Sequence, residues 1–231
     1  MIWTIISAIT VFLFSLWLGY KKFVHIDQIS ARTFLMGTTF ALATFLILRF
    51  LHDLGYFPEA IAGGFMASIY ALIAGILFGT AYRQYKNKSE MGAIEYFNRS
   101  FVSDILPNLI ALTLIVAGIA RTSIFNDLAI TPIRITAGLS LISLGVYGLT
   151  MRLIPEFRRK GFVLLDRTIV WTNFLSFKWV SEDVLELEFR YNQVIRIYHT
   201  VIPLEDRARV EEILNKKLIQ KLEQQQDEET E

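Results

Sequence analysis

The sequence contains no cysteine, and only three of its 231 residues are histidine. The absence of cysteine excludes disulfides, thiolate zinc sites, iron–sulfur clusters and cysteine nucleophiles. Charged residues are also scarce: they make up 19% of the chain, against about 25% in a typical soluble domain. Hydrophobic residues make up 53% and are concentrated in long runs. This composition excludes a disordered protein and an ordinary soluble globular domain.

The chain also lacks a strongly basic region. Residues 1–154 contain eleven Lys or Arg and seven Asp or Glu, and residues 155–231 contain twelve and fifteen, so the two parts carry net charges of +4 and −3. The basic residues of the first part lie at the ends of apolar runs, where membrane proteins place them. We therefore expect the lipid bilayer as a partner and no nucleic acid.

Five apolar runs in residues 1–155 predict a bundle of five transmembrane helices. About 20 helical residues cross a hydrocarbon core of about 30 Å. The fourth run is the weakest, because its clean apolar stretch covers only 105–120, although a proline near its start is tolerated in a first helical turn. The predicted spans are 2–20, 33–52, 60–82, 102–120 and 135–154.

Positive charges predict the orientation of these spans. The first, third and last connections carry Lys or Arg. The second carries none, and the fourth has Arg121, with Arg134 at the edge of the next span. We therefore expect a multi-pass protein of the cell membrane, with its amino terminus outside and its carboxyl terminus in the cytoplasm. The first run has no basic leader, so we interpret it as a retained anchor and not as a signal peptide.

The third span contains small residues at every fourth position, which places them on one helix face. Small side chains let a second helix approach closely within the membrane. The partner is either a neighbouring span of the same chain or, in a homo-oligomer, a second copy. The residues are Gly63, Ala67, Ala71, Gly75 and Gly79.

Polar residues of the spans gather at the predicted outer ends. Such residues either anchor the helices at the interface or form a cluster that binds a headgroup or an ion. They are Arg49, His52, Asp53 and Arg134. Between the third and fourth spans, Met91, Ile94, Phe97 and Phe101 predict an amphipathic helix on the inner membrane surface, with a plain loop as the alternative.

The carboxyl-terminal part has a different periodicity. Short β-rich runs at 161–165, 168–171, 174–179, 184–190 and 194–202 predict an antiparallel sheet, and a helix with an apolar face begins at Pro203. We therefore predict an α+β domain over residues 160–222, in which the helix covers the sheet, followed by a disordered acidic tail over 224–231.

This region resembles a known family. The pattern of Trp171, Phe174, Phe177 and Trp179, followed by an alternating strand and by 202–207 leading into 210–214, is similar to the small pleckstrin-homology-like domains found at the ends of uncharacterised bacterial membrane proteins. The resemblance covers about residues 160–222 and implies a binding or scaffolding module without catalysis. Five strands are fewer than the seven of a complete pleckstrin-homology barrel.

No arrangement of residues indicates catalysis. There is no phosphate-binding loop, nucleophile elbow or His-Glu-x-x-His motif, and the three histidines lie on different predicted sides of the membrane, so we expect no catalytic, cofactor or metal site. Arg158, Arg159 and Lys160 are either a topology signal or contacts to lipid headgroups. We therefore expect a non-enzymatic membrane scaffold or accessory subunit, which has a protein partner or forms a homo-oligomer and whose carboxyl-terminal domain binds a protein or the membrane surface. The alternatives are a small transporter or channel subunit and a lipid-handling membrane enzyme.

Overall fold

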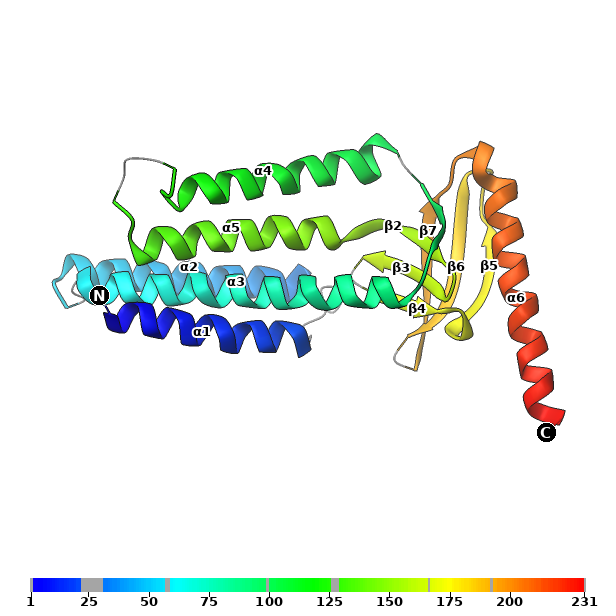
Figure 1. Ribbon diagram of the computed structural model, residues 1–231, viewed down its shortest axis with the longest axis horizontal. Helices are drawn as coiled ribbons and strands as arrows, with labels where there is room; N and C mark the ends of the chain where they lie inside the picture. Colours follow the sequence, from blue (N-terminus) through cyan, green and yellow to red (C-terminus); the bar gives the residue numbers. More distant parts are fainter. Residues whose placement is uncertain are drawn as a thin grey trace. The chain divides into compact units, whose positions relative to one another are not determined.

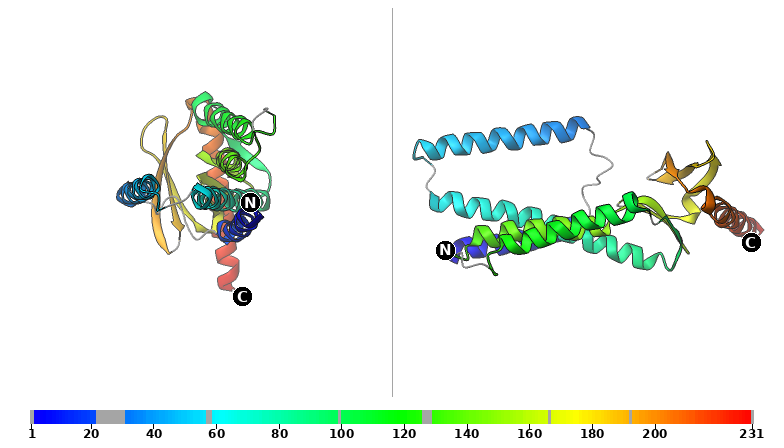
Figure 2. Two further views of the ribbon diagram at one scale, coloured as in Figure 1. Left: turned by 90° about the vertical axis from the view of Figure 1, so that its left-hand side faces the viewer. Right: turned by 90° about the horizontal axis from the view of Figure 1, so that it is seen from above.

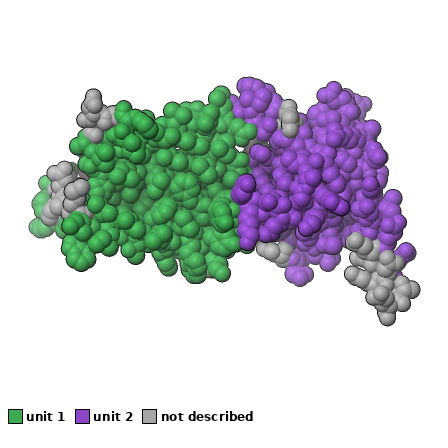
Figure 3. Space-filling view, in the orientation of Figure 1, with its two compact units in different colours: residues 1–83, 108–150 green, residues 84–107, 151–231 purple. Residues whose placement is uncertain are grey.

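The computed structural model describes residues 2–21, 31–56, 59–98, 100–125, 129–165, 167–191 and 193–230. The chain divides into two compact units, coloured separately in Figure 3. Residues 1–83 and 108–150 form the helical unit, and residues 84–107 and 151–231 form the sheet unit. The sheet unit therefore includes a segment from the middle of the chain as well as its carboxyl-terminal part.

Five apolar helices precede the main part of the sheet unit. Three of them, at Ile2–Lys21, Ile61–Glu90 and Pro132–Thr150, are long and apolar enough to cross a membrane by length and composition, and Leu106–Arg121 is a shorter apolar helix. The prediction of apolar helices of transmembrane type is therefore confirmed for these three. The helices are α1 Ile2–Lys21, α2 Ala31–Asp53, α3 Glu59–Glu90, α4 Leu106–Arg121 and α5 Pro132–Thr150.

Helices α1 and α3 pack closely and run parallel. A Cβ atom added at Gly75 would lie 2.5 Å from the carbonyl oxygen of Phe12, and one added at Gly79 would lie 2.7 Å from the amide nitrogen of Tyr20. Nearer the amino ends, Gly64 lies beside Thr4. Contact positions thus increase together along both helices, and backbone approaches backbone because glycine has no side chain.

Helices α4 and α5 also pack through glycine, but they run antiparallel (Figures 1 and 2). A Cβ atom at Gly138 would lie 2.5 Å from the carbonyl oxygen of Gly118, and one at Gly145 would lie 2.5 Å from that of Ala111. Positions rise along one helix as they fall along the other. Pro107 is the second residue of α4 and follows the π-helical turn Phe101–Ile105.

The sheet unit contains two antiparallel sheets. The first has the order β1-β2-β3-β4 and the second the order β5-β6-β7. Each strand of the second sheet follows its neighbour in sequence, whereas β1 and β2 are separated by α4 and α5. The strands are β1 Ile94–Phe97, β2 Arg152–Arg158, β3 Gly161–Leu165, β4 Arg167–Val170, β5 Phe174–Trp179, β6 Val184–Tyr191 and β7 Val194–Val201.

A final helix, α6 Arg207–Thr230, lies alongside β5 (Figure 1). The predicted antiparallel strands after residue 160 and the final helix are confirmed, but the strands form two sheets and not one. Helix α6 continues to Thr230 and so includes most of residues 224–231, where the sequence predicted disorder. The predicted amphipathic helix between the third and fourth spans is wrong: α3 continues to Glu90, and β1 follows it.

The core of the sheet unit is aromatic. Phe157, Phe162 and Phe174 are fully buried, and Trp171 packs against both Phe162 and Phe174 with ring centroids 5.7 and 5.5 Å apart. Helix α6 contributes buried Val210 and Leu214 to the same core. Because β2 supplies Phe157 and β1 supplies buried Tyr96, both strands missed by the sequence prediction are part of the core.

Candidate functional site

A basic pocket is the most distinctive polar feature of the sheet unit. Its volume is about 230 Å³. Three segments form it: the turn between β2 and β3, the end of β4 with the residues after it, and one face of α6. Among the described residues that line it there is no carboxylate. The lining residues are Arg159, Lys160, Val170, Trp171, Thr172, Lys217, Gln220 and Lys221.

The turn that carries Arg159 and Lys160 is held by backbone hydrogen bonds. The amide nitrogen of Arg159 donates to the carbonyl oxygen of Ala93 at 3.0 Å, and that of Lys160 donates to Met91 at 3.1 Å. The indole Nε1 of Trp171 donates to the carbonyl oxygen of Arg158 at 3.0 Å. Both basic side chains are exposed, so a fixed backbone presents two cations at the mouth of the pocket.

Helix α6 supplies two further cations. Lys217 and Lys221 are four residues apart and therefore lie on the same helix face, where like charges destabilise a helix. The Lys217 ammonium donates to Glu95 Oε1 at 3.0 Å and to the carbonyl oxygen of Arg159 at 3.1 Å. The Lys221 ammonium donates to the carbonyl oxygen of Phe174 at 2.6 Å. Burial, and then the charge of Arg190, lower the pKa of Lys221.

A buried charge cluster lies elsewhere in the sheet unit. The Glu156 carboxylate is 1% exposed and accepts hydrogen bonds from Arg152 Nε at 2.9 Å and from Arg158 Nε. The Arg158 Nη1 atom also donates to the carbonyl oxygens of Lys88 at 2.8 Å and Gly92 at 2.9 Å. Arg158 thus donates to carbonyl oxygens at and just beyond the carboxyl end of α3, where a positive charge is favourable.

An acidic groove of about 620 Å³ runs along β1. Its lining includes Glu95, Glu205 and Asp206, with Arg209 as a basic residue. The Tyr96 hydroxyl donates to Asp206 Oδ2 at 3.0 Å. Burial, and then this hydrogen bond, raise the pKa of Tyr96. The groove is acidic, whereas the pocket described above is basic. Glu95 lines the groove and pairs with Lys217, which lines the basic pocket.

The outer face of the second sheet carries a polar row across three strands. Glu186 accepts hydrogen bonds from Lys178 at 2.9 Å and pairs with His199 at 2.7 Å. The hydrogen bond from Lys178 is the main cause that lowers the pKa of Glu186. Over the described part of the chain, no group of three His, Asp or Glu side chains is arranged to hold a metal ion.

The structure separates the three basic residues expected to contact lipid headgroups. Arg158 points into the buried charge cluster, whereas Arg159 and Lys160 line the basic pocket. Of the expected outer polar cluster, the side chains of Arg49 and His52 lie outside the described residues. Asp53 is exposed, and Arg134 Nη1 donates to the carbonyl oxygen of Ala129 at 2.9 Å.

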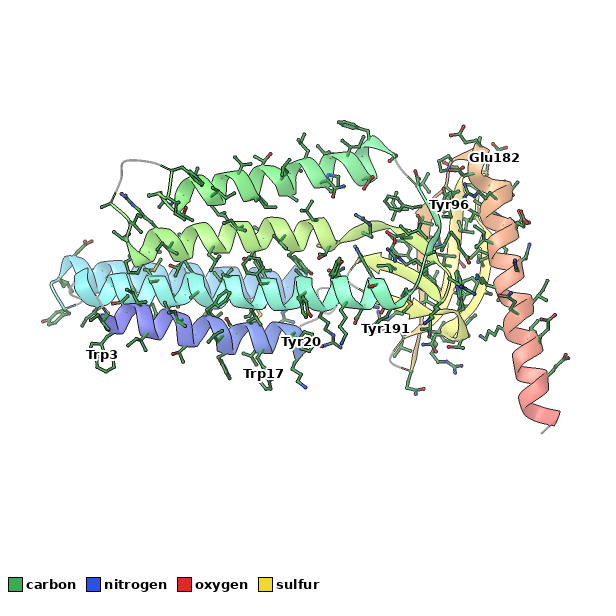
Figure 4. All side chains as sticks on the ribbon, in the orientation of Figure 1. Trp3, Trp17, Tyr20, Tyr96, Glu182 and Tyr191 are labelled. Atoms are coloured by element: carbon green, nitrogen blue, oxygen red, sulfur yellow. The ribbon has the colours of Figure 1, made fainter. Side chains whose placement is uncertain are left out.

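The small-residue stripe of α3 contacts neighbouring helices of the helical unit. Ala67 and Ala71 are buried, and the Ser15 hydroxyl of α1 donates to the carbonyl oxygen of Ala71 at 3.4 Å. Gly75 and Gly79 contact α1 as described above. Figure 4 shows Trp3 at the amino end of α1, with Trp17 and Tyr20 near its carboxyl end, where aromatic side chains suit the membrane interface.

Sequence reasoning missed Lys217, Lys221 and Glu156. No role was expected for these two lysines of the final helix, although their spacing of four residues, with Gln220 between them, places three polar groups on one face. Glu156 lies in a segment assigned to the exit from the fifth span. Glu156 and Arg158 alternate with the apolar Phe157, and this short alternation was the signal for a strand.

A domain of unknown function, DUF5673, is found at residues 153–219. The match runs from β2 into α6 and includes Arg159, Lys160 and Lys217 of the basic pocket, whereas β1 lies outside it. The chain matches no curated protein and no solved structure.

Proposed function

We propose that this chain is a non-enzymatic scaffold or accessory protein that crosses the cell membrane five times and holds a binding domain at its cytoplasmic surface. The observation that carries this proposal is that the sheet unit is built from two separated segments. The chain passes between the two units after residues 83, 107 and 150. A domain attached at three points cannot turn freely as one on a single linker does, which suits a protein that positions a partner.

The pairing of β1 with β2 supports an even number of crossings between them. Strands β1 and β2 are hydrogen-bonded neighbours, so they lie on the same side of any membrane. If α5, which is long and apolar enough, crosses the membrane, α4 must cross it as well to return the chain. The π-helical turn Phe101–Ile105 directly precedes α4, and together they give 21 residues, about the length needed.

The parallel packing of α1 and α3 supports a crossing by α2. The carboxyl end of α1 lies beside the middle of α3, because Gly79 contacts the Tyr20 backbone. The amino ends of both helices lie together, because Gly64 contacts Thr4. The chain must therefore return the length of α1 before α3 begins. Helix α2 has 23 residues, enough to make this return across a hydrocarbon core.

The arrangement of the sheet unit supports a pleckstrin-homology-like fold. The sequence alone indicated five strands, and β1 and β2 bring the number to seven, in sheets of four and three strands followed by a helix that contributes to the core. Catalysis has no comparable support, because the raised pKa of Tyr96 makes its hydroxyl, which pairs with Asp206 in the acidic groove, a poor nucleophile. A channel lined by the α3 glycines lacks support, since Gly75 and Gly79 pack against α1 of the same chain.

Single cysteines test the crossings by α3, α4 and α5 directly, because the chain contains no cysteine of its own. We expect Tyr56→Cys and Phe125→Cys to react with a membrane-impermeant maleimide in intact cells. Ser181→Cys, on the sheet unit, should react only after permeabilisation. The cysteine-free parent is the control. Labelling of Phe125→Cys and Ser181→Cys from the same side would contradict the crossing by α4.

Native mass spectrometry of the full chain in mild detergent tests the scaffold role. A second protein bound in fixed stoichiometry supports an accessory subunit. A homo-oligomer that conducts ions or solutes in liposomes, with no second protein, would replace this proposal with a channel or carrier.

A further inference from the structure

We propose that the basic pocket of the sheet unit binds a phosphate group, carried either by a lipid headgroup or by a small soluble molecule. This inference deepens the proposed function, because it names the chemical class that the binding domain recognises. The pocket volume is about 230 Å³. Since one water molecule occupies about 30 Å³, this volume admits a phosphate together with several waters.

Charge is the first argument. The lining contains four cationic side chains and, among the described residues, no carboxylate. Glu95 neutralises only Lys217, whose ammonium lies 3.0 Å away. Within the part of the chain that the structure describes, Arg159, Lys160 and Lys221 form no ion pair with a carboxylate. A phosphate with two negative charges and several acceptor oxygens matches these charges.

Rigidity is the second argument. Carbonyl oxygens of Ala93 and Met91 fix the turn that bears Arg159 and Lys160. The Lys217 ammonium and the Trp171 indole bind carbonyl oxygens of the same turn. The cations are therefore gathered before any ligand arrives, which lowers the entropic cost of binding.

The polar donors around the pocket are the third argument. Thr172 and Gln220 line it next to the cations, and both can donate hydrogen bonds to phosphate oxygens. Lys221 uses one of its three donors on the Phe174 carbonyl and retains two. Its position four residues from Lys217 places two ammonium groups on one helix face, an arrangement that a bound anion relieves.

The experiment measures the stabilisation of the purified full chain by inorganic phosphate, with chloride at matched ionic strength as the reference. A ligand that binds only the folded protein stabilises it by an amount that grows with the logarithm of the ratio of ligand concentration to Kd once that ratio is large, so its Tm rises with ligand concentration in a way that reports the Kd. The test variant is Arg159→Gln with Lys160→Gln, both exposed. The matched control is Lys216→Gln with Arg196→Gln, exposed cations outside the pocket. We expect the test variant to weaken phosphate binding by about tenfold or more and the control to keep it.

A second variant changes binding in the opposite direction. Glu95→Gln removes the carboxylate that neutralises Lys217, so it should strengthen phosphate binding, which a merely destabilised protein would not do. A parent that phosphate stabilises no more than chloride does, together with an absence of the lipid effect described next, would overturn the proposal. So would equal losses in the test and control variants.

Nanodiscs distinguish the two sources of phosphate. The full chain is placed in phosphatidylcholine with or without phosphatidic acid. If phosphatidic acid raises the Tm of the parent but not of the Arg159→Gln and Lys160→Gln variant, the phosphate comes from a lipid headgroup. If only soluble phosphate has this effect, the ligand is a soluble molecule. Neither result depends on a protein partner or on the number of crossings, so failure here leaves the tests of the scaffold role standing.

Discussion

Substitution Glu156→Gln should destabilise the sheet unit far more than the loss of an exposed charge does. The Glu156 carboxylate is 1% exposed, while its partners Arg152 and Arg158 are 25% and 14% exposed. Removal of one charge from a buried pair costs about 3–5 kcal/mol, because the remaining charge stays buried without its partner. Arg152 keeps Asp104 at 3.9 Å, so we expect the lower end of this range, about 3 kcal/mol.

The assay is thermal unfolding of the full chain in detergent, followed by tryptophan fluorescence. The chain has four tryptophans, and the substitutions Trp3→Phe and Trp17→Phe restrict the signal to Trp171 and Trp179 of the sheet unit. A chain of this size loses about 2–4 °C in Tm per kcal/mol, so Glu156→Gln should lower the Tm by about 6–12 °C.

The matched control is Glu90→Gln. Glu90 pairs with Lys86 at 4.0 Å, and both side chains are more than half exposed. Such a pair contributes about 0.3–0.5 kcal/mol, so the control should lower the Tm by less than about 2 °C. Equal effects of Glu156→Gln and Glu90→Gln would refute the reasoning, because they would mean that burial does not set the contribution of the cluster.

Three further predictions concern other contacts. Gly75→Leu should lower the Tm of the helical unit, because the new side chain meets the α1 backbone, whereas Gly63→Leu, with only a side-chain tip at 3.6 Å, should change it little. Tyr96→Phe should cost about 1.5–3 kcal/mol in chemical unfolding, since it removes a hydrogen bond to a carboxylate; no change would contradict this contact. Glu186, whose pKa is lowered chiefly by the hydrogen bond from Lys178, contributes stability at neutral pH that is lost as the pH falls through its folded pKa. The Tm difference between the parent and Glu186→Gln should therefore shrink below about pH 4.3, and a constant difference would exclude this linkage.

The strands after residue 160 could be predicted because their signals are local. Glu186 and Glu188 alternate with Leu185 and Leu187, and this alternation fixes both the strand and its buried face. The final helix was equally clear, since Val210 and Leu214 are four residues apart and both are buried in the core.

The strands β1 and β2 could not be predicted in the same way. Strand β1 has four residues, too few to distinguish alternation from helical spacing, so Ile94 and Phe97 fitted a helix equally well. Strand β2 follows α5 after a single residue, and its apolar residues extended the pattern of the span. What defines both strands is their pairing with each other across 54 intervening residues, from Phe97 to Arg152.

The candidate site follows the same division. Residue types and their order were enough to predict the apolar helices and the strand-rich second part. They also contained no recognised catalytic motif. Only the tertiary structure gathered Arg159, Lys160, Lys217 and Lys221 around one pocket and turned Arg158 away to the buried Glu156. Periodicity reports how each segment divides between interior and surface, because that division repeats every two or 3.6 residues. The neighbours of a side chain from distant segments depend on strand pairing and helix packing, which long-range contacts decide.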